Sequence, residues 1–293
     1  MATNGDSSSG VAQNMTRHQY ASVNILQAYD VLQPKRTSGK PWLVYVHGGY
    51  FRDPKVDSSS FKPTISLLEA SALKDSISGY ASIDYRLSPH PEHPQDPSTT
   101  PSDKLNTARW PDQPNDVLAA LRHLQQHYPD SKNYILIGHS VGATLAFLTG
   151  LNCHAAGLIT PRALLGVSGI YDFPAIHKSN PDYESMTKNG MDPKFYKEAS
   201  PGLYSAETYA KKWVVDSKEQ SGKRVVVLAH SRDDGLVGWD QVEDMQAVFS
   251  RVDEKVETDI GIELVELKGA HNTIWEKGTE MVRAVEAVLK QLE

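Results

Sequence analysis

The chain of 293 residues has one cysteine, Cys153, so it can form no intramolecular disulfide, which is typical of a reducing compartment. No apolar run approaches the roughly 20 residues that a membrane-spanning helix needs. The first residues lack the charged-then-apolar order of a secretory signal. These absences predict a cytoplasmic protein without a membrane segment, and a chain of this length can bury a core without disulfides.

Motifs for metals and nucleotides are also missing. There is no C-x-x-C pair, H-E-x-x-H or EF-hand pattern, and neither G-x-G-x-x-G nor G-x-x-x-x-G-K-[ST] occurs. The net charge of −6 is mild, and both signs are spread along the chain, unlike the basic patch of a nucleic-acid binder. We therefore expect no metal, no cofactor and no nucleic-acid partner. The oligomeric state stays open, a homodimer included.

The most informative motif is a G-x-S-x-G around Ser140. An apolar run at residues 134–137 leads into Gly138-His139-Ser140-Val141-Gly142, and a helical pattern follows. This order is typical of the nucleophile elbow, a sharp strand-to-helix turn that holds a serine exposed. Its glycines are needed where a Cβ would collide with neighbouring backbone. The motif predicts Ser140 as a nucleophile, and the alternative is a plain structural turn.

A serine nucleophile needs a base and an acid that orients the base. The apolar residues 225–228 predict a strand buried on both faces, and two aspartates compete on the loop after it. Asp234 precedes Val237 by three residues, an arrangement similar to the acid loop of many α/β-hydrolases. We therefore predict Asp234 as the acid. Asp233 would form or cap the turn.

The candidate base is His271. It follows an alternating run at residues 262–267, which predicts an edge strand with one wet face. In this fold the order along the chain is serine, acid, histidine. Four histidines lie at predicted strand ends: His47, His139, His230 and His271. Of these, only His271 comes after both Ser140 and the acid.

A fourth part, the oxyanion hole, is predicted at a second strand end. The strand at residues 41–46 runs into His47-Gly48-Gly49-Tyr50-Phe51. Backbone amides at such a turn can point at a developing oxyanion without side-chain obstruction. We place the donors at Gly49 and Tyr50, to within one residue, together with the amide of Val141 after the nucleophile. His47 is expected to brace the loop by hydrogen bonds.

Strand-like and helical patterns alternate over residues 15–293, which we interpret as one domain. Residues 1–14 are polar, small and rich in Ser and Gly, as in disordered tails. Residues 80–87 predict a further strand, and a long proline-rich connection covers residues 88–113, a length that is often functional. Residues 173–215 predict a small cap, or otherwise a plain surface excursion.

Together these stretches resemble the fungal-type kynurenine formamidases. Residues 47–51 resemble their H-G-G-x-W motif, with Phe51 in place of tryptophan, and the similarity includes residues 84–91, the proline-rich loop and residues 138–147. It spans essentially residues 41–271. The resemblance implies an α/β-hydrolase fold, with a mostly parallel central sheet, helices on both faces and a small cap insertion.

It also implies a reaction: hydrolysis of an aryl formamide, N-formyl-L-kynurenine, to L-kynurenine and formate in tryptophan degradation towards NAD. Ser140 would attack the formyl carbon, His271 would take its proton and Asp234 would hold the imidazole. Two alternatives stay open. One is a short-acyl carboxylesterase of the hormone-sensitive-lipase-like type, and the other is a hydrolase-fold binding protein without catalysis.

Overall fold

The computed structural model describes residues 14–34, 39–214, 223–250 and 260–293, so the predicted disordered tail lies outside it except for residue 14. Eight strands form one sheet in the order β1-β2-β4-β3-β5-β6-β7-β8. The strands are β1 (Thr16–Gln19), β2 (Ala28–Leu32), β3 (Trp42–Val46), β4 (Gly79–Ile83), β5 (Tyr134–His139), β6 (Ala163–Val167), β7 (Arg224–Ser231) and β8 (Ile260–Leu267).

The sheet is parallel from β4 to β8, and only β1 and β2 add an antiparallel end. Strands of a parallel sheet are covered on both faces, so they are apolar throughout. This explains why β3 and β5 are buried at every position, whereas the edge strand β8 is mostly half-buried.

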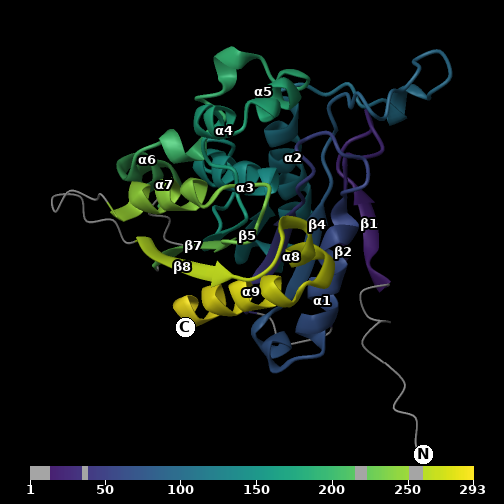
Figure 1. Ribbon diagram of the computed structural model, residues 1–293. Coiled ribbons are helices and arrows are strands. Elements are labelled where there is room, and N and C mark those ends of the chain that lie inside the picture. The colour runs from purple at the N-terminus through teal and green to yellow at the C-terminus, as the bar shows by residue number, and fades with distance from the viewer. Residues whose placement is uncertain (1–13, 35–38, 215–222, 251–259) are drawn as a thin grey trace, which may run out of the picture.

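Nine helices of the described residues belong to this sheet's two layers or to the connections between strands. They are α1 (Lys62–Glu69), α2 (Asp112–His127), α3 (Val141–Asn152), α4 (Phe173–Ser179), α5 (Pro181–Lys188), α6 (Ala206–Trp213), α7 (Trp239–Ser250), α8 (His271–Lys277) and α9 (Thr279–Leu292). Figure 1 shows α2, α3, α6 and α7 above the sheet and α1 and α9 below it.

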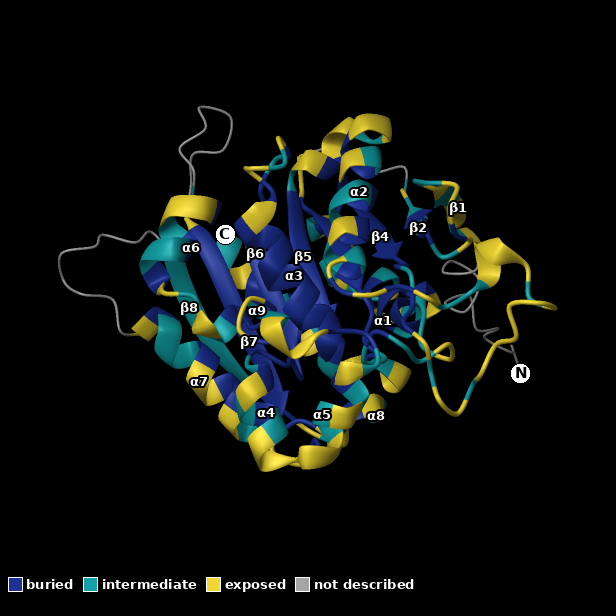
Figure 2. Ribbon diagram, turned by 90° about the horizontal axis from the view of Figure 1, so that it is seen from above, coloured by how far each residue is buried: buried dark blue, intermediate teal, exposed yellow. Residues whose placement is uncertain are grey.

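The period of two along each strand divides the apolar side chains between two cores. Val44 and Leu136 pack under α2, α3 and α7, while their neighbours Tyr45 and Ile137 pack against α1 and α9. Helix α3 is buried over nearly its whole length, and Figure 2 shows it at the centre of the molecule beside β5 and β6. The elbow that starts α3 therefore sits against the buried core of the fold.

These features confirm the predicted fold class, but one predicted strand was too long. The strand expected at residues 80–87 ends at Ile83, because both of its neighbours stop pairing there, Val46 of β3 and Tyr29 of β2. The proline-rich connection contains a short 3-10 turn, Ser102–Lys104, and ends where α2 begins at Asp112.

The segment predicted as a cap, described as far as residue 214, contains α4, α5 and α6 between β6 and β7. We call this stretch the cap segment. Across the described ranges, no helix has the length and apolar character needed to span a bilayer.

Candidate active site

Ser140 stands at the junction of β5 and α3, in a backbone conformation that side chains rarely adopt. Its φ is 56° and its ψ is −128°. The turn is tight, since a Cβ on Gly138 would collide with the Gly142 carbonyl and a Cβ on Gly142 with the carbonyl of Val46. The Ser140 amide donates to the Val167 carbonyl at 2.9 Å, which ties the elbow to the neighbouring strand β6.

His271 and Asp234 form a buried pair. The Nδ1 atom of His271 lies 2.8 Å from Oδ1 and 2.9 Å from Oδ2 of Asp234, and the His271 amide donates to the Asp234 carbonyl at 2.9 Å. The amides of Leu236 and Val237 donate to Asp234 Oδ1 at 3.1 and 2.7 Å. Asp233, the competing acid, is exposed and has no contact with His271 among the described residues.

The pKa of Asp234 reflects this environment. Burial alone would raise it, but the hydrogen bond and the charge interaction with His271 lower the pKa to about 2. The carboxyl group is therefore ionised at every pH at which the protein would work. An ionised acceptor at Nδ1 holds the proton of His271 there and leaves Nε2 free to accept one.

The loop after β3 approaches the elbow closely. A Cβ on Gly48 would lie only 3.0 Å from the Cβ of Ser140. Gly49, Tyr50 and Phe51 all have positive φ, at 86°, 50° and 64°. The amides of Gly49 and Tyr50 donate to no other group of the described residues, and both residues line the pocket that contains Ser140.

Phe51 occupies the position at which the formamidase motif has tryptophan. Its ring is buried, with its centroid 5.9 Å from Trp110 and 6.2 Å from Phe173. An aromatic side chain thus joins the oxyanion loop to the proline-rich connection and to the start of the cap segment. The substitution keeps this aromatic packing.

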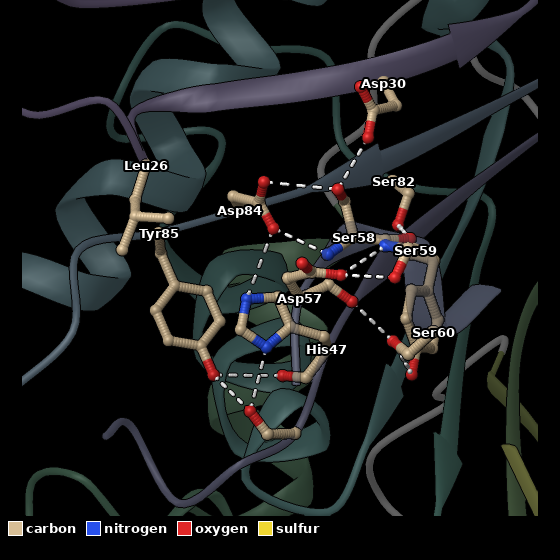
Figure 3. Close-up of polar contacts among 12 residues, drawn as sticks. Leu26, Asp30, His47, Asp57, Ser58, Ser59, Ser60, Ser82, Asp84 and Tyr85 are labelled. Atoms are coloured by element: carbon tan, nitrogen blue, oxygen red, sulfur yellow. Dashed lines mark hydrogen bonds and ion pairs between the residues drawn. The ribbon is translucent and has the colours of Figure 1, made fainter. Parts of the chain in front are cut away.

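His47 braces the same loop from behind (Figure 3). Its Nδ1 atom lies 2.9 Å from the Gly48 carbonyl and its Nε2 atom 3.6 Å from Oδ1 of the buried Asp84. Asp84 in turn accepts hydrogen bonds from Arg17 and from the Ser58 amide, both at 2.6 Å. The Tyr85 ring stacks on His47 at 4.2 Å, and its hydroxyl donates to the Gly48 carbonyl at 2.7 Å.

Burial opposes charge on both members of this His47–Asp84 contact. It lowers the pKa of His47 despite the nearby Asp84, and it raises the pKa of Asp84 despite His47 and Arg17. His47 does not line the pocket with Ser140. It therefore acts on the loop and not on a ligand in that pocket.

A pocket of about 390 Å³ contains Ser140 and His271, with Asp234 behind the imidazole. The oxyanion loop, the cap segment, the loop after Asp234 and helix α8 all contribute to its walls, as does His90 from the proline-rich connection. Tyr50 stacks on Tyr183 of α5 at 5.2 Å, and its hydroxyl lies 2.9 Å from Thr187 Oγ1. The pocket thus has an aromatic wall close to the elbow.

The site also includes residues for which no sequence motif predicts a role. Asp84 lies one residue beyond a strand, and its contacts come from β1 and the turn before α1, far away in sequence. Trp275 lines the pocket one helical turn after His271 on α8. An i, i+4 relation to the predicted base was the one signal available for Trp275. Arg52 also lines the pocket, without any motif to mark it.

Comparison with known proteins identifies the family of the chain. A family model for the α/β hydrolase fold matches residues 106–258, more than half of the chain. The chain therefore belongs to the α/β-hydrolase family, and the fold and its relatives define it as a hydrolase.

Two curated relatives narrow the class. The chain is 30% identical to the kynurenine formamidase-like hydrolase fscH of Fusarium equiseti, over 86% of this chain and 84% of the relative. It is 31% identical to the kynurenine formamidase avaC of Aspergillus versicolor, over 80% and 84%. It is thus related to kynurenine formamidases over most of its length.

Solved structures with the same fold are more distant. A thermostable esterase from Pseudomonas putida aligns with a TM-score of 0.62 at 19% identity, covering 95% of this chain and 81% of the esterase. A carbohydrate esterase from gut microbiota aligns with a TM-score of 0.63 at 16% identity, covering 94% and 95%. These likenesses concern the fold alone.

Proposed function

We propose that the protein is a serine hydrolase that cleaves N-formyl-L-kynurenine to L-kynurenine and formate. The observation that carries this proposal is the buried Asp234–His271 pair, whose imidazole lines one pocket with the elbow serine. The same pocket is lined by Gly49 and Tyr50, whose amides donate to no other described residue. The formamide substrate comes from the relatives, which are named kynurenine formamidases at about 30% identity.

In the first half of the reaction, Ser140 Oγ attacks the formyl carbon and His271 Nε2 takes the hydroxyl proton. Negative charge then develops on the formyl oxygen, where the amides of Gly49, Tyr50 and Val141 donate to it. His271 returns the proton to the aryl nitrogen as the C–N bond breaks, so that the aryl amine leaves neutral and Ser140 carries the formyl group.

In the second half, a water molecule gives a proton to His271 and attacks the formyl carbon of the ester. The same amides hold the second tetrahedral intermediate. Its collapse returns the proton from His271 to Ser140 and releases formic acid, which ionises to formate by giving its proton to solvent. Asp234 stabilises the imidazolium in both halves without becoming protonated, in keeping with its pKa of about 2.

The Ser140 hydroxyl makes no hydrogen bond to another described residue. Nucleophile–base contacts are often long in the absence of substrate and shorten only in the complex. We expect the contact between Ser140 and the His271 imidazole to form when the substrate binds.

An esterase acting on short acyl groups would use the same nucleophile, base and amides. The test therefore compares kcat/KM for N-formyl-L-kynurenine with kcat/KM for p-nitrophenyl acetate. We expect the formamide to be the better substrate, and labelling of Ser140 by a fluorophosphonate to stop both activities. A clear preference for the acetate would assign the protein to the esterases. Absence of labelling in the folded protein would contradict the serine mechanism.

A further inference from the structure

Arg52 places a positive charge in the pocket that contains Ser140. It lines the pocket with Ser140, and its guanidinium forms no hydrogen bond or ion pair with any other residue that the structure describes. Arg86, by contrast, is held by Asp116 at 2.8 Å. Burial lowers the pKa of Arg52, which means that its charge has lost part of its hydration. A partly dehydrated guanidinium favours an anionic ligand.

The backbone fixes Arg52 relative to the oxyanion hole. The amides of Arg52 and Asp53 both donate to the Gly49 carbonyl, at 3.0 and 2.8 Å. These two bonds close the turn whose first residues carry the amides proposed for the oxyanion. The backbone from which the Arg52 side chain extends is therefore fixed relative to the oxyanion hole.

Acidic groups lie close to Arg52. Asp53 lines the same pocket, and Glu92 of the proline-rich connection also acts on the charge of Arg52. The Lys55 amide donates to Asp53 Oδ1 at 2.9 Å, whereas Oδ2 accepts no hydrogen bond from the described residues. A ligand with one negative and one positive group matches this arrangement better than a simple anion does.

We propose that Arg52 and Asp53 bind the α-amino-acid head group of the substrate, with the carboxylate on the Arg52 guanidinium and the ammonium on Asp53. This inference rests on the proposed function, in which the substrate is an aryl formamide that carries an amino-acid side chain. Tyr183 from α5 and Trp275 from α8 line the same pocket and then take the aryl ring. A guanidinium presents a planar fork of donors that matches a carboxylate.

The experiment measures binding by calorimetry, so it does not depend on turnover. Three ligands are compared. The first is L-kynurenine, and the second is 4-(2-aminophenyl)-4-oxobutanoate, its analogue without the α-amino group. The third is 2'-aminoacetophenone, which lacks the whole amino-acid group. For the wild-type protein we expect L-kynurenine to bind at least about tenfold more tightly than 2'-aminoacetophenone, the effect of one charge-assisted hydrogen bond.

Variants separate the two contacts. Arg52→Gln should remove the preference for L-kynurenine, and Arg52→Lys should keep part of it because the charge stays but the fork is lost. Asp53→Asn should weaken L-kynurenine and leave the analogue without the amino group unchanged. Arg109→Gln is the matched control, since Arg109 is exposed and outside the pocket, and it should change neither.

Equal affinity of the wild-type protein for L-kynurenine and 2'-aminoacetophenone, or no measurable binding of either, would overturn the proposal. So would an unchanged preference in a folded Arg52→Gln protein. Parallel assays with N-formyl-L-kynurenine and 2'-formamidoacetophenone distinguish this failure from failure of the proposed function. Hydrolysis of both formamides at equal kcat/KM would support the proposed reaction and contradict the head-group site. Preferential binding of L-kynurenine without hydrolysis of either formamide would support the head-group site and contradict the proposed reaction.

Discussion

Replacement of Asp234 by asparagine should nearly abolish turnover while the fold is kept. The contacts of Asp234 dictate how the new amide would sit. Oδ1 accepts from the amides of Leu236 and Val237, so the asparagine oxygen takes this place. The NH₂ group then takes the place of Oδ2, 2.9 Å from Nδ1 of His271. A donor at that point opposes a proton on Nδ1 and favours the tautomer with the proton on Nε2, the atom that should accept the serine proton.

A wrong tautomer of this kind costs about 10⁴-fold in kcat, or about 5 kcal/mol of transition-state stabilisation. The assay is kcat for formamide hydrolysis by Asp234→Asn and by the control Asp233→Asn, with circular dichroism to show that both proteins are folded. Asp233 is exposed and forms no hydrogen bond with His271, so Asp233→Asn should lower kcat less than about threefold and change stability by no more than about 0.5 kcal/mol. More than a tenth of wild-type kcat in Asp234→Asn, or an equal loss in both variants, would refute the reasoning.

Three further outcomes are expected. Ser140→Ala should lower kcat by about 10⁶-fold without unfolding the protein, and a folded variant with a tenth of the activity would point to another nucleophile. Asp84→Asn should lower kcat about tenfold or more with little change in KM, because a misplaced oxyanion donor costs up to 10²–10³-fold. The control is Asp30→Asn, because Asp30 contacts Ser58 but not His47, and this variant should leave kcat unchanged. Burial lowers the pKa of His230, so the unfolded chain binds the proton more readily. Stability measured by urea unfolding should therefore fall as the pH drops below about 6.5, and His230→Gln should reduce this slope by up to about 1.4 kcal/mol per pH unit. An unchanged slope would contradict the assignment.

The parts of the site that sequence could predict are those with local rules. The elbow around Ser140 needs glycines at fixed offsets between a strand and a helix, and both the offsets and the flanking patterns are visible in the chain. Asp234 and His271 follow from strand ends and from their order. The spacing to Val237 could favour Asp234 over Asp233, but only the structure shows that Asp234 turns inward to His271 while Asp233 faces solvent.

The parts that sequence could not predict depend on contacts between distant segments. The strand expected to continue past Ile83 stops because both of its neighbours end, and no local pattern contains that information. Asp84 acquires its role from Arg17 and Ser58, which lie 67 and 26 residues away in the chain. No sequence pattern distinguishes Arg52 from the other arginines. Only the structure shows that Arg52 lines the pocket and forms no ion pair with a described acidic residue.

Tyr50 joins two parts of the molecule that are usually regarded as separate. Its backbone amide belongs to the oxyanion loop, whereas its ring stacks on Tyr183 and its hydroxyl meets Thr187, both on α5 of the cap segment. By reciprocity, whatever changes the equilibrium position of α5 also changes the geometry of the amide, and a transition state bound by that amide favours one position of α5. Mutations that reshape the cap segment for a new substrate would therefore alter turnover together with selectivity. The two properties cannot evolve independently while Tyr50 connects them.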